Sequence, residues 1–176
     1  MRAGILLLAA LFVAVPVQGV EVSPITVRVE QTSGNASSGF RHTQRKALKV
    51  YVSNTATSDS PGLRVKFFYF GKSLKAGDTT ILQQGERKAD VKTHATVTVE
   101  TPEIESVYTE EHGQPVDRKG GRGAPRGNYL GHQKIVRYKT VEATGRKVTG
   151  YGVQVFSGNL LVAEAFSEPS LKALVK

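Results

Sequence analysis

Short runs in which apolar and polar residues alternate constrain the fold of this chain more than any other feature. Ile25, Val27 and Val29 alternate with polar residues, and the same pattern recurs at 46–53, 63–70 and 94–100. Such alternation places the apolar side chains on one face of a half-buried strand, whereas a helix repeats about every 3.6 residues. Only residues 170–175, which follow Pro169, have a helical pattern. The sequence therefore predicts an all-β protein with a short C-terminal helical turn.

Turn-forming residues separate these runs and set the expected number of strands. Residues 54–62 (Asn-Thr-Ala-Thr-Ser-Asp-Ser-Pro-Gly) are typical of a turn, and Gly158-Asn159 is a good two-residue hairpin turn. The polar stretch 32–39 is expected to be a loop. Weaker or later strands are expected at 79–84, 104–109, 133–142, 151–157 and 160–166. The total is about seven to nine short strands, and this spacing favours an antiparallel sandwich.

Residues 25–166 resemble an immunoglobulin-like or fibronectin-like secreted module. The hairpin Gly-Tyr-Gly-Val-Gln-Val-Phe-Ser-Gly-Asn-Leu-Leu-Val-Ala-Glu-Ala-Phe at 150–166 carries the resemblance best. The resemblance implies an immunoglobulin-like β-sandwich, similar in kind to modules of bacterial envelopes and of pilus- or archaellum-associated proteins. It also implies a role in assembly or adhesion. The chain has no Cys and no Trp, so the disulfide and core Trp of antibody domains are absent, and antigen-receptor function is not implied.

The N-terminus predicts export. An apolar run at 5–15 is followed by Pro16 and by small residues up to Gly19, which is the order of a secretion signal cut before Val20. The alternative is cleavage after Gly4, which would keep the apolar run as a fibre helix, as in pilin-like precursors. The run is short and Pro16 interrupts it, and both facts argue against that alternative. We expect a signal peptide at 1–19 and a single domain at 20–176.

The lack of Cys indicates a bacterial compartment. Small secreted eukaryotic domains usually depend on disulfides, so an exported chain without Cys is more typical of a bacterial periplasm, outer-membrane surface or extracellular space. Once the signal is removed, the chain is not expected to be an integral membrane protein.

A long segment at 109–131 is rich in Gly and Pro and concentrates the positive charge of a chain whose formal net charge is +9. Within residues 117–126, four cations stand against one acid; they are Arg118, Lys119, Arg122 and Arg126. Long loops inside compact domains tend to be functional or disordered, and Arg side chains bind phosphate, sulfate and carboxylate groups. We therefore treat these four cations as candidate binding residues. Nucleic acid is disfavoured, because no aromatic residue is interleaved among them and the chain is expected to be exported.

Aromatic residues form a second candidate site. If Phe67 and Tyr69 face the core, Phe68 and Phe70 point outward, and Tyr51 lies on the outward face of its own strand. Exposed aromatics would mark an interface. Alternatively, a loop or the terminal helix covers them. Phe156 on the later hairpin is also expected to face outward.

Catalytic and metal-binding patterns are not found. The four histidines are His42, His94, His112 and His132, and none has the spacing of a His-x-x-x-His or His-Glu-x-x-His site. Glu110-Glu111-His112 together with His132 would bind a metal only if the long loop folded back. No Gly-x-Ser-x-Gly, phosphate-loop or dinucleotide motif occurs. We predict no catalytic residue, no metal and no cofactor.

Together these observations predict a non-enzymatic, exported binding or structural protein. It would act in a cell-envelope, adhesion or pilus-like assembly through contacts with a protein partner, including a second copy of itself. The alternative is a binder of anionic glycans or other polyanions through residues 117–126. A third hypothesis, an envelope hydrolase, requires a pocket in which His and acidic groups converge.

Overall fold

The computed structural model describes residues 23–116 and 138–175. Ten strands and one 3-10 helix occur in these residues: β1 (Ile25–Ser38), β2 (Arg41–Asn54), β3 (Ser60–Ser73), β4 (Thr79–Val91), β5 (Thr96–Glu100), β6 (Ile104–Thr109), β7 (His112–Pro115), β8 (Tyr138–Val141), β9 (Thr144–Ser157), β10 (Leu160–Phe166) and η1 (Pro169–Leu174). Every strand pair is antiparallel. The prediction of an all-β protein with a short C-terminal helical turn is confirmed.

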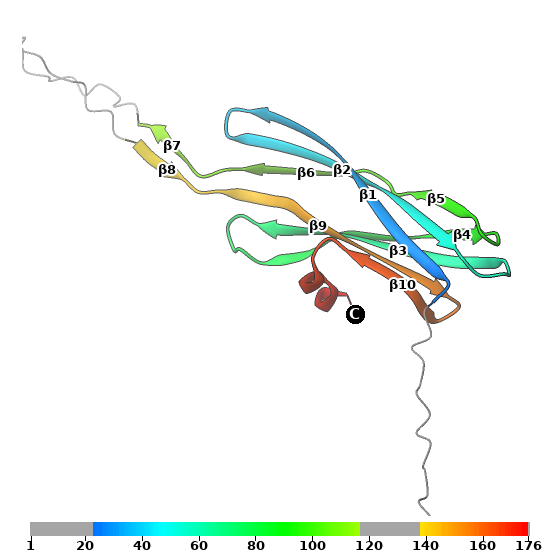
Figure 1. The fold of residues 1–176 in the computed structure, drawn as a ribbon. Coiled ribbons are helices and arrows are strands. Elements are labelled where there is room, and N and C mark those ends of the chain that lie inside the picture. Colours follow the sequence, from blue (N-terminus) through cyan, green and yellow to red (C-terminus); the bar gives the residue numbers. More distant parts are fainter. Residues whose placement is uncertain (1–22, 117–137, 176) are drawn as a thin grey trace, which may run out of the picture.

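Eight strands form one continuous sheet, and β7 pairs with β8 in a small separate hairpin. The order is β1-β2-β6-β9-β3-β4, with β5 added to β2 and β10 added to β9. In Figure 1, β1, β2, β5 and β6 lie on one side of the molecule, and β3, β4, β9 and β10 lie on the other. Residues on these two sides that are far apart in sequence therefore face each other.

Strand β9 belongs to both sides. Its first residues, Thr144 and Gly145, pair with β6, and the rest of the strand pairs with β3 as far as Phe156. Gly145 has a φ of 88°, and a Cβ there would lie 2.5 Å from the Val107 carbonyl oxygen. Only glycine combines this left-handed backbone with so close an approach. The crossing of β9 from one side to the other therefore depends on this residue.

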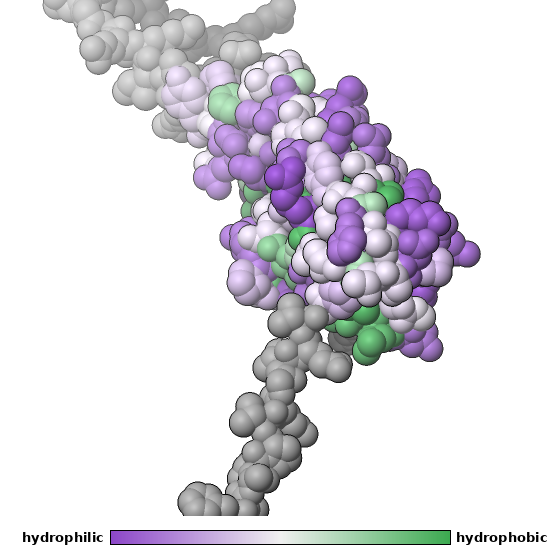
Figure 2. Space-filling view, turned by 45° about the vertical axis from the view of Figure 1, so that its right-hand side comes forward, coloured by the Kyte–Doolittle hydropathy of each residue, from purple (hydrophilic) through white to green (hydrophobic). Residues whose placement is uncertain are grey.

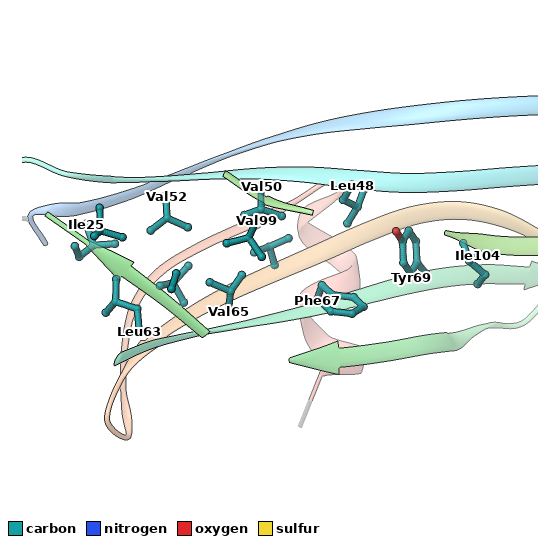
Figure 3. Close-up of a cluster of buried hydrophobic side chains, with 14 of the residues drawn as sticks. Ile25, Leu48, Val50, Val52, Leu63, Val65, Phe67, Tyr69, Val99 and Ile104 are labelled. Carbon is teal, nitrogen blue, oxygen red and sulfur yellow. The ribbon is translucent and has the colours of Figure 1, made fainter. Parts of the chain in front are cut away.

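The main core lies between the two sides (Figure 3). As predicted, alternate residues of β2 and β3 are buried in it: Leu48, Val50, Val52, Leu63, Val65, Phe67 and Tyr69. The Tyr69 hydroxyl lies 2.6 Å from Thr101 Oγ1 and donates to the Pro102 carbonyl (3.2 Å), so its polar end is satisfied inside the core. Burying each large apolar side chain contributes about 1.5–3 kcal/mol, which stabilises the fold without a disulfide.

Several local predictions are wrong: β3 already begins at Ser60, inside the expected turn at 54–62, and three others differ as follows. Residues 32–38, expected to be a loop, continue β1 and pair with β2 up to Ser38↔Arg41, with Gly39 (φ 59°) in the turn. Their backbone groups pair regularly although their side chains meet no apolar core, so no hydrophobic alternation marks them. His94, expected in a strand, lies in the turn before β5 with a φ of 51°. The described residues also contain ten strands, more than the seven to nine predicted.

The segment expected as one long loop at 109–131 begins with regular structure. His112–Pro115 forms β7 and pairs with Tyr138–Val141, which is β8. Residues 117–137 lie outside the described residues, as does the signal peptide expected at 1–19. Among the described residues, no helix has the length and hydropathy needed to cross a membrane.

Candidate binding surfaces

The four cations predicted from the long loop cannot be placed. Arg118, Lys119, Arg122 and Arg126 all lie within 117–137, outside the described residues. Their role in binding therefore stays a prediction.

Phe68 and Phe70 are buried, with 5 % and 0 % of their surface exposed. They form a second, smaller core on the outer side of β3, together with Leu171 of η1 and with Ile81 and Phe166 at its margin. Of the two alternatives drawn from the sequence, the exposed aromatic interface is wrong for these two residues. The terminal helix covers them, as Figure 1 shows for η1 beside β9 and β10.

Two glycines of β9 make room for this cover. A Cβ at Gly152 would lie 2.6 Å from Phe166 Cδ1, and a Cβ at Gly150 would lie 2.6 Å from Leu171 Cδ1. Real Cβ atoms do not come so close to other heavy atoms. Phe166 and Leu171 therefore lie directly against the β9 backbone, where they pack with Phe68 and Phe70.

Tyr51 faces outward, as predicted, and is half-buried. Its hydroxyl donates to the Glu30 carboxylate (2.9 Å), and the Arg28 guanidinium lies 4.8 Å from its ring centre. Arg28 also pairs with Glu30 at 2.7 Å. The ring is thus held in a small polar network on the outer face of β1 and β2.

A groove with a volume of about 770 Å³ runs across the outer face of β3, β4, β9 and β10. Its apolar walls come from Phe68, Phe156, Leu161 and Val175, and its polar lining includes Lys66, Gln84, Glu86 and Gln154. The Lys66 ammonium lies 5.2 Å from the centre of the Phe156 ring. Figure 2 shows one face of the molecule, where hydrophilic residues predominate and hydrophobic residues are exposed only in small groups. We call the groove between β3, β4, β9 and β10 the outer groove.

The strand edges differ in how they are protected. Edge strand β4 carries charged residues at Glu86, Arg87, Lys88 and Asp90 and has a register shift against β3, and β10 also has a register shift. Strand β5 has only 5 residues. Strand β1 has 14 residues, pairs with β2 without a register shift, and is uncharged from 31 to 38. Charges, irregularities and short length are the usual protections of an edge, and this part of β1 has none of them.

Two of the histidines, His42 and His112, stack on aromatic rings. His42 stacks on Tyr108 with ring centres 5.0 Å apart, and His112 stacks on Phe40 at 4.0 Å. Within the described residues, no group of three or more His, Asp or Glu side chains is placed to bind a metal ion. His132, the fourth member of the conditional metal site, lies outside them.

A polar pocket of about 310 Å³ lies at the turn end of the β1–β2 hairpin, beyond the apolar core. It is lined by Asn35, Ala36, Ser37, His42, Thr43, Gln44, Tyr108 and Lys147. The Gln44 side-chain oxygen accepts a hydrogen bond from the Val148 N–H (3.1 Å), which leaves the amide NH₂ as a donor. No sequence motif signals this pocket, because its residues come from β1, β2, β6 and β9, and only the strand register brings them together.

The chain matches no protein-family model and shows no significant match to a curated protein. Among solved structures it is similar to the X-ray structure of Northeast Structural Genomics Consortium target SoR45. The sequences are 11 % identical, the match covers 85 % of this chain and 91 % of that chain, and the TM-score is 0.35. A TM-score of 0.35 is too low for this similarity to indicate a shared fold or function.

Proposed function

We propose that this chain is an exported, non-enzymatic immunoglobulin-like module that works in a cell-envelope, adhesion or fibre-related assembly through contacts between proteins. The contact we propose is antiparallel pairing of β1 with β1 of a second copy. The observation that carries the proposal is the unprotected edge at residues 31–38.

The immunoglobulin-like arrangement is supported by the way in which the strands pack. All pairs are antiparallel, and side chains from β2 and β5 meet side chains from β3 and β9 across the main core. Such packing of two antiparallel layers is typical of β-sandwiches.

Pairing through β1 is supported by the chemistry of its edge. An edge strand presents unpaired N–H and C=O groups, which form a template for another strand. Within the described residues, β1 pairs only with β2, so one side of residues 31–38 remains open. Protein edges of this length are normally blunted, and the contrast with β4 indicates that this one is kept open for a partner.

A second copy suits this edge because residues 31–38 are neutral and mostly small (Gln-Thr-Ser-Gly-Asn-Ala-Ser-Ser). Two positively charged chains can pair here without bringing like charges together at the contact. A strand that pairs with its own copy also gives closed two-fold symmetry, the commonest arrangement of soluble oligomers.

Light scattering coupled to size-exclusion chromatography tests this proposal on the chain from residue 20 to 176. Over a micromolar concentration series we expect a monomer–dimer equilibrium. The double variant Thr32→Lys/Gly34→Lys should raise the dissociation constant of the dimer about tenfold or more, because charges on an edge strand oppose the addition of another strand. The matched control Thr98→Lys/Val107→Lys adds the same charge on exposed residues of β5 and β6 and should leave the dimer intact.

A monomer over the whole series would overturn the self-pairing proposal. A dimer that survives Thr32→Lys/Gly34→Lys but is lost with Leu161→Asp would also overturn it and would place the contact at the outer groove instead.

A further inference from the structure

The polar pocket at the turn end of the β1–β2 hairpin has the chemistry of a binding site. It is a different site from the β1 edge at which pairing with a second copy is proposed. Along the inner face of β1 the residues change from Val27 and Val29, which pack on the core, to Asn35 and Ser37. Along the inner face of β2 they change from Leu48 and Val50 to polar residues. The pocket is the space that the end of the apolar core leaves between these polar rows and β9.

Hydrogen-bond donors dominate the lining of this pocket. Lys147, the Asn35 and Gln44 amides, and the Ser37 hydroxyl all line it, and none of its lining residues is acidic. The Lys147 ammonium lies 5.7 Å from the centre of the Tyr108 ring, which is buried and stacks on His42. Two carboxylates lie outside this lining: Glu110 is 3.7 Å from His42 Nε2, and Glu105 lines an adjacent pocket that shares Asn35, Ala36 and Thr43.

A second cation, Lys46, lies two residues beyond Gln44 on the same face of β2. The Lys46 ammonium donates to the Val148 carbonyl (3.2 Å), next to Lys147 in the chain. Burial, and then the positive charge of Lys147, lowers the pKa of Lys46. Within the described residues, neither lysine forms an ion pair with a carboxylate. Two neighbouring cations without a counter-charge favour a bound anion.

We propose that this pocket binds a sulfated or phosphorylated sugar unit. The volume of about 310 Å³ is at the lower end of the range for small-ligand sites and is far larger than one water, whose share of liquid volume is about 30 Å³. Lys147 pairs with the oxyanion, while the amides and hydroxyl donate to sugar oxygens. The shared chemistry is one tetrahedral oxyanion on a sugar, whether it comes from a free sugar phosphate or from a sulfated glycan chain.

Isothermal titration calorimetry on the chain from residue 20 to 176 tests the proposal with four probes: inorganic sulfate, inorganic phosphate, glucose 6-phosphate and a sulfated heparin-type hexasaccharide. We expect at least one of the two sugar probes to bind more tightly than the free ions. Lys147→Gln should weaken that binding about tenfold, which corresponds to the loss of one charge-assisted contact. The matched control Lys49→Gln removes an exposed cation of β2, paired with Glu100 at 3.4 Å, and should leave affinity unchanged within about twofold.

The pattern across probes identifies the source of the ligand. Binding of the hexasaccharide alone assigns the site to a glycan chain, and binding of glucose 6-phosphate alone assigns it to a free sugar phosphate; either result supports the pocket. If Lys147→Gln and Lys49→Gln lose the same amount of affinity, the pocket proposal is overturned, because the anion would then be attracted unspecifically to a positively charged protein. Binding that is abolished by Arg118→Ala/Arg122→Ala/Arg126→Ala but kept in Lys147→Gln would also overturn it and would assign the polyanion to residues 117–126. Absence of binding by every probe at low salt is the third result that would refute the pocket.

Discussion

At the scale of single residues, packing on the outer face of β9 requires two residues without a Cβ atom. Gly150 and Gly152 leave the space in which Leu171 and Phe166 approach the backbone. A larger residue at either position would force the cover of the second core outward. The conformational freedom of glycine is not the reason for their presence; the reason is the absence of a Cβ.

Gly152→Ala should therefore lower the free energy of unfolding by about 1–3 kcal/mol, the usual effect of overpacking. Urea denaturation followed by circular dichroism measures the change. Gly34→Ala is the matched control, since its Cβ would lie 3.8 Å from Arg45 Cβ and a strand prefers Ala to Gly by about 0.5–1 kcal/mol. Equal effects of the two substitutions would contradict the proposed role of Gly152.

Asp59 stabilises the turn between β2 and β3 in a pH-dependent way. It accepts hydrogen bonds from the Thr93 backbone N–H and from the Lys92 ammonium, both at 2.9 Å. These contacts, the Thr93 bond first, hold the pKa of Asp59 below its usual value of 3.8. A carboxylate with a depressed pKa in the folded state adds stability above its unfolded pKa, and this stability is lost as the pH falls through the folded pKa.

Asp59→Asn should accordingly lower the melting temperature at neutral pH. The difference from the original chain should shrink as the pH falls below about 4 and disappear once the pH is below the pKa of Asp59 in the folded state. Differential scanning calorimetry at several pH values measures it, with Glu100→Gln as the control, because that residue forms only an exposed ion pair with Lys49. A difference that stays constant down to pH 2 would refute the assignment.

At the scale of elements, η1 is short but covers a core of its own. It has 6 residues, and it lacks a side-chain N-cap hydrogen bond, so local forces hold it weakly. Leu171 anchors it by packing against Phe68 and Phe70. The element is therefore held mainly by tertiary packing.

Leu171→Ala should lower the free energy of unfolding by about 2–5 kcal/mol, because it leaves a cavity over the two aromatic rings. Leu174→Ala, at an exposed position of the same helix, should change it by less than about 0.5 kcal/mol. Chemical denaturation of both variants measures the contrast. If the two substitutions have the same effect, η1 does not cover the core in the way described.

The elements also show what sequence patterns could and could not predict. Alternation predicted the rows of β2 and β3 that face the main core, because every second residue in these rows is apolar. It missed residues 32–38 of β1, because their strand is held by backbone pairing and their side chains are polar on both faces. It left the cover of Phe68 and Phe70 undecided, since the answer depends on Gly150 and η1 lying against the same face of the sheet. The polar pocket forms only through the register of four strands, and no residue pattern within a single strand predicts it.

At the scale of the whole molecule, export is the prediction that fixes where the chain works. When the full chain is expressed in a bacterial host, the protein recovered outside the inner membrane should begin at Val20 by intact-mass measurement. Gly19→Leu should block cleavage, because the position before the cut requires a small residue, whereas Gln18→Leu should be tolerated. A chain that begins at Ile5 would contradict the signal peptide and support the retained helix of a pilin-like precursor.

The sharing of β9 between the two sides of the sheet has a consequence for the kinetics of folding. Arg64 of β3 pairs with Phe156 of β9, and Thr109 of β6 pairs with Thr144, so neither side is complete until residues 144–157 have been made. Pairing across such long sequence separation folds slowly compared with local hairpins, because the loop must close before the contacts form. The same strand that joins the two sides therefore also determines that the fold is completed only after nearly the whole chain has been synthesised.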